Sequence, residues 1–256
     1  MEHKNKSLFF AEDLSDIFLR VRPELKNVFP QAFQPVEAGS IIEISGYSGS
    51  GKSCFTLDLI ASTLISNLEA NNPKVLLIDT DKSLNIIKLC EICNDKLTTE
   101  SGSPTDLRDH IERLQIMTCD RLNFSSIFSK LEAILTDDPQ ISLIILDNLG
   151  VFYYFQSSMN LEETSTVTKK ENYIASYLKK FNLLCEKFKV TFVYVKPHYI
   201  MNHREIRENF TTHSVTLEKI DGETFSMDIR QKEEFKGKYF YSVASNGLKF
   251  KECDDN

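Results

Sequence analysis

The sequence predicts an α/β protein with a doubly wound, mostly parallel sheet. A glycine-rich loop, GYSGSGKS at residues 46–53, follows the alternating apolar segment 41–44 and precedes a stretch with helical apolar spacing. Three further apolar runs, 75–79, 141–147 and 190–195, are typical of buried parallel strands. Apolar residues recur at helical spacing over 172–188, with lysines on the other face, which predicts a crossover helix.

The pattern changes after residue 214. Residues 215–217, 224–229 and 239–243 read as short strands, and Asp221-Gly222 and Asn246-Gly247 read as turns. The first two strands could form a hairpin through Asp221 and Gly222. The parallel sheet is therefore expected to continue into antiparallel strands.

Length and composition favour one domain. The chain has 256 residues, of which 41% are hydrophobic and 26% charged, enough to bury a core without disulfides or a metal. We expect an N-terminal linker or helical segment at 1–35, a nucleotide-binding domain at 36–250 and a tail at 251–256. The apolar runs are too short to span a membrane and no apolar signal segment follows the charged start, so an intracellular, soluble protein with no membrane partner is expected.

The net charge of −7 is the opposite of what a domain that grips many phosphates needs. Any contact with DNA is thus expected to be local or made through a partner. Six cysteines, including a CxxC at Cys90 and Cys93, raise the question of a zinc site. The pair lies in an apolar run with helical spacing (Leu84, Ile87, Leu89, Ile92), and no second Cys/His pair stands at a suitable distance. These thiols are therefore interpreted as small core residues.

The loop at residues 46–53 matches the full phosphate-binding pattern, in the strand-loop-helix context that its chemistry requires. Its glycines let backbone N–H groups turn toward phosphate oxygens, and the helix N-terminus adds a favourable partial charge. Lys52 is expected to neutralise the β- and γ-phosphates, and Ser53 to offer its hydroxyl to Mg²⁺. ATP and Mg²⁺ are the expected cofactors, and the alternative is a glycine-serine turn of no function. The predicted nucleotide contacts in this segment are Gly46, Tyr47, Ser48, Gly49, Ser50, Gly51, Lys52, Ser53 and Cys54.

Acidic and imidazole side chains follow the other predicted strands. Asp147 ends the apolar run 141–147 and is predicted to be a Walker B carboxylate that binds Mg²⁺ together with Ser53; the alternative is a residue that caps the next turn. Ligands of doubly wound sheets bind at the carboxyl ends of the strands. Lys52, Asp81, Asp147 and His198 are all expected at that edge.

Four segments resemble the RecA-like recombinases of eukaryotes: Gly39 to Glu43, LLIDTD at 76–81, LIILDNL at 143–149 and YSVASNGLKF at 241–250. Their order and the short length resemble most a small paralogue class that lacks the N-terminal helical DNA-binding domain. The resemblance covers residues 36 to 250 and is carried by the phosphate-binding loop and the Walker B strand. It implies a RecA-like P-loop ATPase core.

The resemblance also implies a role and partners. It implies a nuclear protein of homologous-recombination DNA repair, which binds ATP, assembles with other recombinase paralogues in a hetero-oligomer and assists the recombinase filament. Single-stranded or branched DNA would be contacted through that complex. Filament-forming relatives link subunits through an aromatic residue and an alanine three positions on, and Leu8 and Ala11 stand in these places here. Packing of this segment on its own domain is the alternative.

The sequence departs from active family members at two places. Where they carry a glutamate that activates water, this chain has Asp81, whose side chain is one methylene shorter and would misplace the water. Asp81 is the candidate catalytic residue, and an ordinary surface aspartate is the alternative. Where the family has a glutamine that contacts the γ-phosphate, this chain has Lys196-Pro197-His198, and His198 could still bond phosphate.

A loop from Tyr199 to His213 is the candidate DNA-facing segment. It carries His203, Arg204, Arg207 and His213 with interleaved Tyr199 and Phe210, although Glu205 and Glu208 dilute its charge and a solvated loop is the alternative. Lys169 and Lys170 are a second basic pair, which could simply belong to the crossover helix.

Three functions stay open at this point. The first is an ATP-binding assembly subunit with little turnover of its own. The second is a DNA-dependent ATPase or strand-exchange enzyme, against which the acidic charge and the missing glutamine weigh. The third is a P-loop kinase acting on a small molecule, which would need an arginine-rich lid, whereas the arginines of this region are Arg204 and Arg207.

Overall fold

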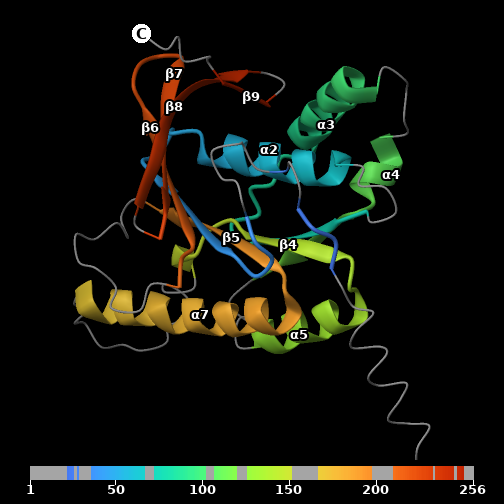
Figure 1. Cartoon of the computed structure of the whole chain (residues 1–256), viewed down its shortest axis with the longest axis vertical. Helices are drawn as coiled ribbons and strands as arrows, with labels where there is room; N and C mark the ends of the chain where they lie inside the picture. The colour runs from blue at the N-terminus through green and yellow to red at the C-terminus, as the bar shows by residue number, and fades with distance from the viewer. Residues whose placement is uncertain are drawn as a thin grey trace, which may run out of the picture.

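The computed structural model is a mixed α/β domain built on a nine-stranded sheet (Figure 1). It describes residues 22–25, 28, 36–66, 72–101, 107–119, 126–151, 167–197, 210–232, 234–244 and 247–250. The helices are α2 (Lys52–Ile65), α3 (Ile86–Ser101), α4 (Leu107–Ile111), α5 (Ile127–Asp137) and α7 (Val167–Phe188). The strands are β1 (Ile41–Gly46), β2 (Lys74–Asp79), β3 (Leu114–Thr118), β4 (Ile141–Leu146), β5 (Thr191–Pro197), β6 (His213–Lys219), β7 (Thr224–Gln231), β8 (Glu234–Ala244) and β9 (Gly247–Phe250).

The strand order is β3-β2-β4-β5-β1-β6-β7-β8-β9. The first six strands in this order, β3, β2, β4, β5, β1 and β6, are parallel. Strands β7, β8 and β9 continue the sheet in antiparallel pairs. Parallel neighbours require crossover connections, and right-handed crossovers place helices on both faces of the sheet. The predicted fold class is confirmed, and the architecture is consistent with a RecA-like fold.

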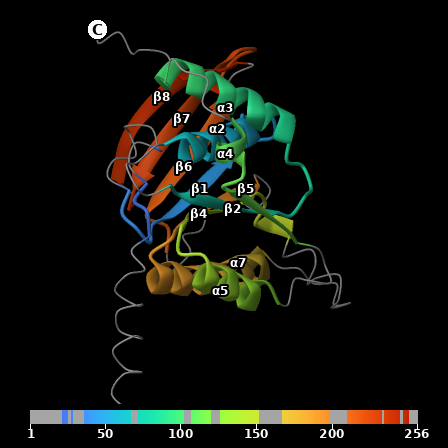
Figure 2. The same cartoon turned by 90° about the vertical axis from the view of Figure 1, so that its right-hand side faces the viewer.

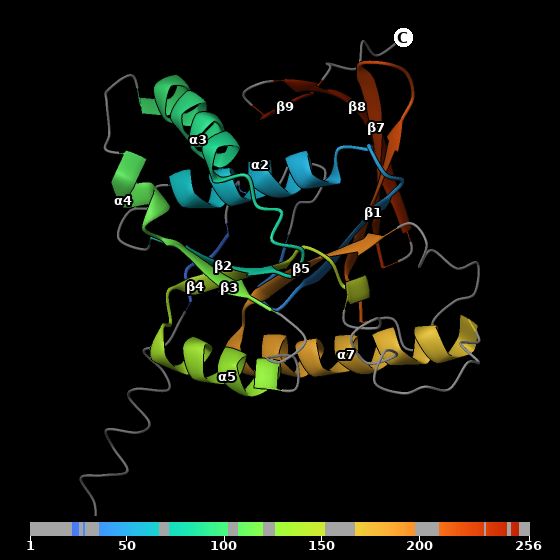
Figure 3. The same cartoon turned by 180° about the vertical axis from the view of Figure 1, so that it is seen from behind.

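Helices cover the two faces of the parallel part in separate layers. In Figures 2 and 3, α2, α3 and α4 lie on one side of the sheet, and α5 and α7 lie on the other. Alternate residues of each strand serve the two layers: in β4, Leu143 and Ile145 pack toward α2, whereas Ile144 and Leu146 pack toward α5 and α7. Because both faces are covered, all six residues of β4 are buried, which explains its continuous apolar run.

The antiparallel extension begins with a strand whose two neighbours run in different directions. β6 pairs in parallel with β1 on one side and antiparallel with β7 on the other. The predicted hairpin between β6 and β7 is confirmed, and Asp221 stabilises its turn because its Oδ1 accepts the N–H groups of Glu223 and Thr224. The strand β6 therefore connects the phosphate-loop strand directly to the C-terminal hairpins.

Several predicted elements are longer in the structure than the sequence indicated. Helix α7 begins at Val167, so Lys169 and Lys170 belong to it. The apolar spacing that predicted a helix around the CxxC is confirmed by α3, where Leu89, Ile92 and Cys93 are buried, but Ile87 is 71% exposed and does not belong to the core. Cys90 is half-buried in the same helix. Helices α4 and α5 and strand β3 were not predicted.

The predicted DNA-facing loop needs one correction. His213 is the first residue of β6 and is buried, and its Nδ1 lies 2.9 Å from Oγ1 of Thr212, so its assignment to a loop that faces DNA was wrong. Phe210 is partly buried and packs against the core on the α5 and α7 side of the sheet. Residues 199–209, with His203, Arg204 and Arg207, lie outside the described residues, as do Leu8 and Ala11.

Arg22 connects the described N-terminal residues to the edge of the sheet opposite the phosphate-binding loop. Its guanidinium donates to the backbone oxygens of Leu135, Asp138, Ile141 and Phe188. The guanidinium carbon Cζ also lies over the Phe188 ring, 5.6 Å from the ring centroid. These oxygens belong to the ends of α5 and α7 and to the start of β4, where helix carbonyl groups lack intrahelical partners.

None of the described helices is long and apolar enough to cross a membrane.

Candidate functional site

The glycine-rich loop leaves β1 through a residue that only glycine fits. Gly46 has φ +149, and a Cβ there would lie 2.3 Å from the carbonyl oxygen of Leu217 and 2.6 Å from Oγ of Ser50. Gly49 and Gly51 also have positive φ values, 77 and 86. The loop thus turns tightly between β1, β6 and the start of α2, as the sequence motif requires.

The first turn of α2 offers its N–H groups to an anion. Gly51 precedes the helix and makes no side-chain cap, and the first turn contains no acidic residue. The 14-residue helix therefore begins with backbone donors that no side chain of the turn satisfies. Together with the helix dipole, this is a suitable place for a phosphate group.

Lys52 folds back over the loop. Its Nζ donates to the backbone oxygens of Gly46 at 2.8 Å and Tyr47 at 2.6 Å. Burial lowers the pKa of Lys52 from its usual value. A lysine held in this position presents its positive charge at the mouth of the loop, where it fits the phosphate oxygens expected from the motif.

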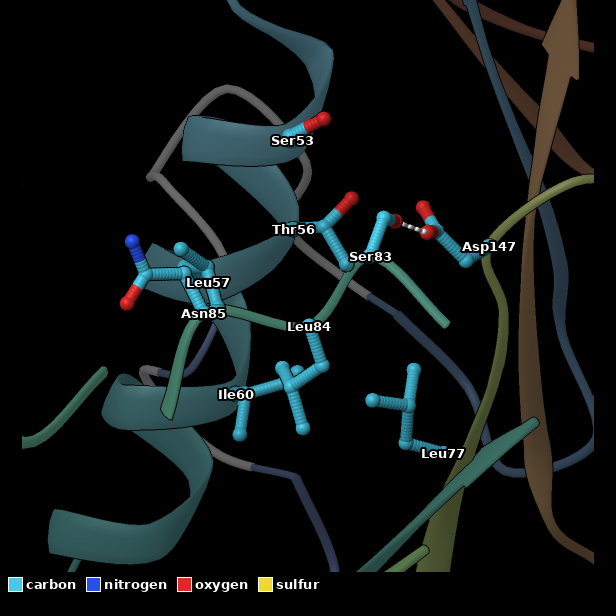
Figure 4. Close-up of a pocket in the computed structure, with 9 residues that line it drawn as sticks. All are labelled: Ser53, Thr56, Leu57, Ile60, Leu77, Ser83, Leu84, Asn85 and Asp147. Atoms are coloured by element: carbon cyan, nitrogen blue, oxygen red, sulfur yellow. Dashed lines mark hydrogen bonds between the residues drawn. The ribbon is translucent and has the colours of Figure 1, made fainter. Parts of the chain in front are cut away.

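A cavity of about 80 Å³ lies between α2 and the carboxyl ends of β2 and β4. Figure 4 shows the polar side chains of Ser53, Thr56, Ser83 and Asp147 in its upper part, the apolar side chains of Ile60, Leu77 and Leu84 in its lower part, and Leu57 and Asn85 at a level between them. Ser53 and Asp147, the two predicted Mg²⁺ ligands, both line this cavity. A hydroxyl and a carboxylate oxygen are ligands that Mg²⁺ accepts, so these residues fit the expected cation.

Ser83 holds Asp147 in the cavity wall. Its hydroxyl donates to Oδ2 of Asp147 at 2.9 Å (Figure 4), and its backbone N–H donates to Oδ1 of Asp79 at 3.2 Å. Burial raises the pKa of Asp147, the hydrogen bond from Ser83 opposes this effect, and the charges of Asp81 and Asp79 add to it. Among the described residues, no three His, Cys, Asp or Glu side chains are grouped so as to hold a metal ion, so Asp147 is the carboxylate that fits the predicted cation, and Asp79 and Asp81 act on it through their charge.

Asp81 lies at the same edge of the sheet, exposed to solvent. Its Oδ2 accepts a hydrogen bond of 2.8 Å from the side-chain amide of Asn148, the residue after Asp147. Asn148 and Ser83 are polar residues of the site that the sequence did not single out. Asn148 directly follows Asp147 and Ser83 comes two positions after Asp81, and this closeness in the sequence was the available signal.

The structure places the other predicted residues as follows. Tyr47, Ser48 and Gly49 are exposed in the loop, Ser50 is buried beneath it, and Cys54 is half-buried in the first turn of α2. Burial raises the pKa of the Cys54 thiol. Lys52, Asp81 and Asp147 each follow the carboxyl end of a parallel strand (β1, β2 and β4), whereas His198 lies outside the described residues.

No family model matches the chain. The chain is similar to DNA repair protein XRCC2. The relative, from Mus musculus, is 27% identical over an alignment of 186 residues, and the match covers 68% of the present chain and 66% of the relative. The chain thus matches just under two thirds of the length of XRCC2. The similarity confirms the resemblance that the sequence motifs indicated.

Proposed function

We propose that this chain is an ATP-binding recombinase paralogue of homologous-recombination DNA repair. In this proposal it acts in the nucleus as a subunit that assists the strand-exchange filament, assembled with other recombinase paralogues and in contact with single-stranded or branched DNA through the complex. The similarity to DNA repair protein XRCC2 supports the role in repair.

One observation carries the nucleotide part of the proposal. Lys52 and Ser53 follow β1, Asp147 follows β4, and the fold brings these separate strand ends to one edge, with Ser53 and Asp147 lining one cavity. The loop would hold the phosphates through backbone N–H groups and Lys52, while Ser53 and Asp147 would hold Mg²⁺. Ser83 would keep the Asp147 carboxylate turned toward the cation.

Slow or absent hydrolysis is part of the proposal. The Asp81 carboxylate accepts a hydrogen bond from the side-chain amide of Asn148. The Asp81 side chain is also shorter than that of the glutamate expected at this place. A carboxylate that is not aligned with an attacking water loses much of its catalytic effect, since errors of about 1 Å cost large rate factors. The alternative of a DNA-dependent ATPase requires the shorter Asp81 carboxylate to reach the attacking water with the oxygen that does not bind Asn148.

The test is nucleotide binding and turnover by the purified chain with Mg²⁺, with and without single-stranded DNA. We expect ATP to bind to the wild type, Lys52→Ala to abolish binding, and turnover to stay far below the usual enzyme range of about 1 to 10³ s⁻¹. Lys130→Ala, which removes an exposed lysine of α5 on the other face, is the matched control. DNA-stimulated turnover that Lys52→Ala removes would favour the ATPase instead.

A further inference from the structure

Tyr241 connects the C-terminal sheet to the phosphate-binding loop. It lies in the middle of β8 with a side chain that is 0% exposed, and its hydroxyl donates to the backbone oxygen of Ser50 at 3.0 Å. The two residues are 191 positions apart in the sequence. Burial is the main cause that raises the pKa of Tyr241, so the hydroxyl keeps its proton at neutral pH.

The contact between β8 and the loop is close. A Cβ at Gly51 would lie 3.3 Å from Oη of Tyr241 and 3.6 Å from Cγ2 of Val243. The Tyr241 ring is itself fixed, since it stacks on Phe225 with 5.4 Å between ring centroids and also contacts Phe250. The strand β9, which follows β8, lies beside α2 (Figure 3).

The bond to Ser50 determines where the next N–H group points. In a planar trans peptide the C=O and the N–H point in opposite directions. Because the Ser50 carbonyl is held toward β8, the N–H of Gly51 points away from β8. A carbonyl turned the other way would present negative charge, instead of a donor, to a phosphate group.

We propose that the Tyr241 hydroxyl is a positioning group of the phosphate-binding loop, which fixes the Ser50–Gly51 peptide so that the Gly51 N–H faces the bound phosphates. This inference rests on the proposed nucleotide binding for its functional consequence, but the hold on the loop exists in the free protein. The packing of the ring needs no hydroxyl, since a phenylalanine would fill the same space between Phe225 and Phe250.

The test compares Tyr241→Phe with Tyr194→Phe. Tyr194 is a matched control because it is also buried, and its hydroxyl donates to Glu43 at 2.6 Å instead of to the loop. Three quantities are measured for each variant: the melting temperature, the amide hydrogen exchange of residues 46–53 in the free protein, and the affinity for Mg²⁺–ADP by calorimetry.

We expect the amide hydrogens of the loop to exchange faster in Tyr241→Phe than in the wild type. This variant should also bind Mg²⁺–ADP about 3- to 10-fold more weakly, the range for one lost buried hydrogen bond. Tyr194→Phe should leave both quantities unchanged, even where it lowers the melting temperature. Unchanged loop exchange in Tyr241→Phe, or equal effects in the two variants, would overturn the inference. If the wild type binds neither Mg²⁺–ADP nor Mg²⁺–ATP while loop exchange still rises in Tyr241→Phe, the hold on the loop is supported and the proposed function fails.

Discussion

The partly buried carboxylate of Asp147, the proposed Mg²⁺ ligand, costs the folded protein stability. It directly follows the fully buried strand β4, and Asp79 and Asp81 stand at the end of the neighbouring strand β2. Burial and the two like charges raise its pKa, so the charged form is destabilised in the folded protein. A bound cation would reverse this penalty.

Asp147→Asn is therefore expected to stabilise the free protein at pH 7 while it abolishes Mg²⁺-dependent nucleotide binding. A carboxyl whose folded pKa lies above its unfolded pKa favours folding at low pH, and this contribution is lost as the pH rises through the folded pKa. The variant should thus melt a few degrees higher than the wild type at pH 7, and the difference should shrink toward about pH 4.

Thermal melts between pH 4 and 8 test this prediction, with nucleotide titration in Mg²⁺ as the second measurement. Asp137→Asn is the control, because Asp137 is an exposed aspartate at the end of α5. It should show neither effect. A variant at Asp147 that melts below the wild type at pH 7 would contradict the idea that this carboxylate is destabilised by burial.

At the scale of elements, the ends of the helices are as important as their packed faces. Helices α5 and α7 both end at the edge of the sheet opposite the phosphate-binding loop, and Arg22 donates to their terminal backbone oxygens and to Ile141 of β4. Without it, four backbone oxygens would lose this donor, and the bonds to two of them, Leu135 and Ile141, are buried.

Arg22→Ala is expected to lower the free energy of unfolding by about 2–4 kcal/mol, because buried hydrogen bonds to a charged donor are lost and their acceptors stay buried. Arg108→Ala is the comparison: Arg108 is exposed on α4 and pairs with Glu112 at 2.8 Å, a surface ion pair that contributes about 0.5 kcal/mol. Urea unfolding of the three proteins measures both changes. Equal losses in the two variants would show that the Arg22 contacts do not stabilise the fold.

At the scale of the whole molecule, the sequence predicted the elements that have a local apolar pattern, and it did not predict contacts between distant segments. The apolar runs at 75–79, 141–147 and 190–195 became β2, β4 and β5, since strands covered on both faces are apolar throughout. Strand β3 is an edge strand with a partly exposed face, including Ile116, so it lacks such a run. The hydrogen bond between Ser83 and Asp147, 64 residues apart, and the bond between Tyr241 and Ser50 depend on the chain path, which no local pattern records.

The charge of the whole chain leads to the last prediction. With a net charge of −7, the isolated protein should bind single-stranded DNA with a dissociation constant weaker than about 10 µM at physiological salt, because few phosphates can be neutralised and few counterions released. Fluorescence anisotropy with a labelled oligonucleotide measures this, repeated over a series of salt concentrations. The slope of log affinity against log salt should be shallow. Tight binding with a steep slope would mean that this chain contacts DNA over a large basic surface by itself, and would return the strand-exchange alternative to consideration.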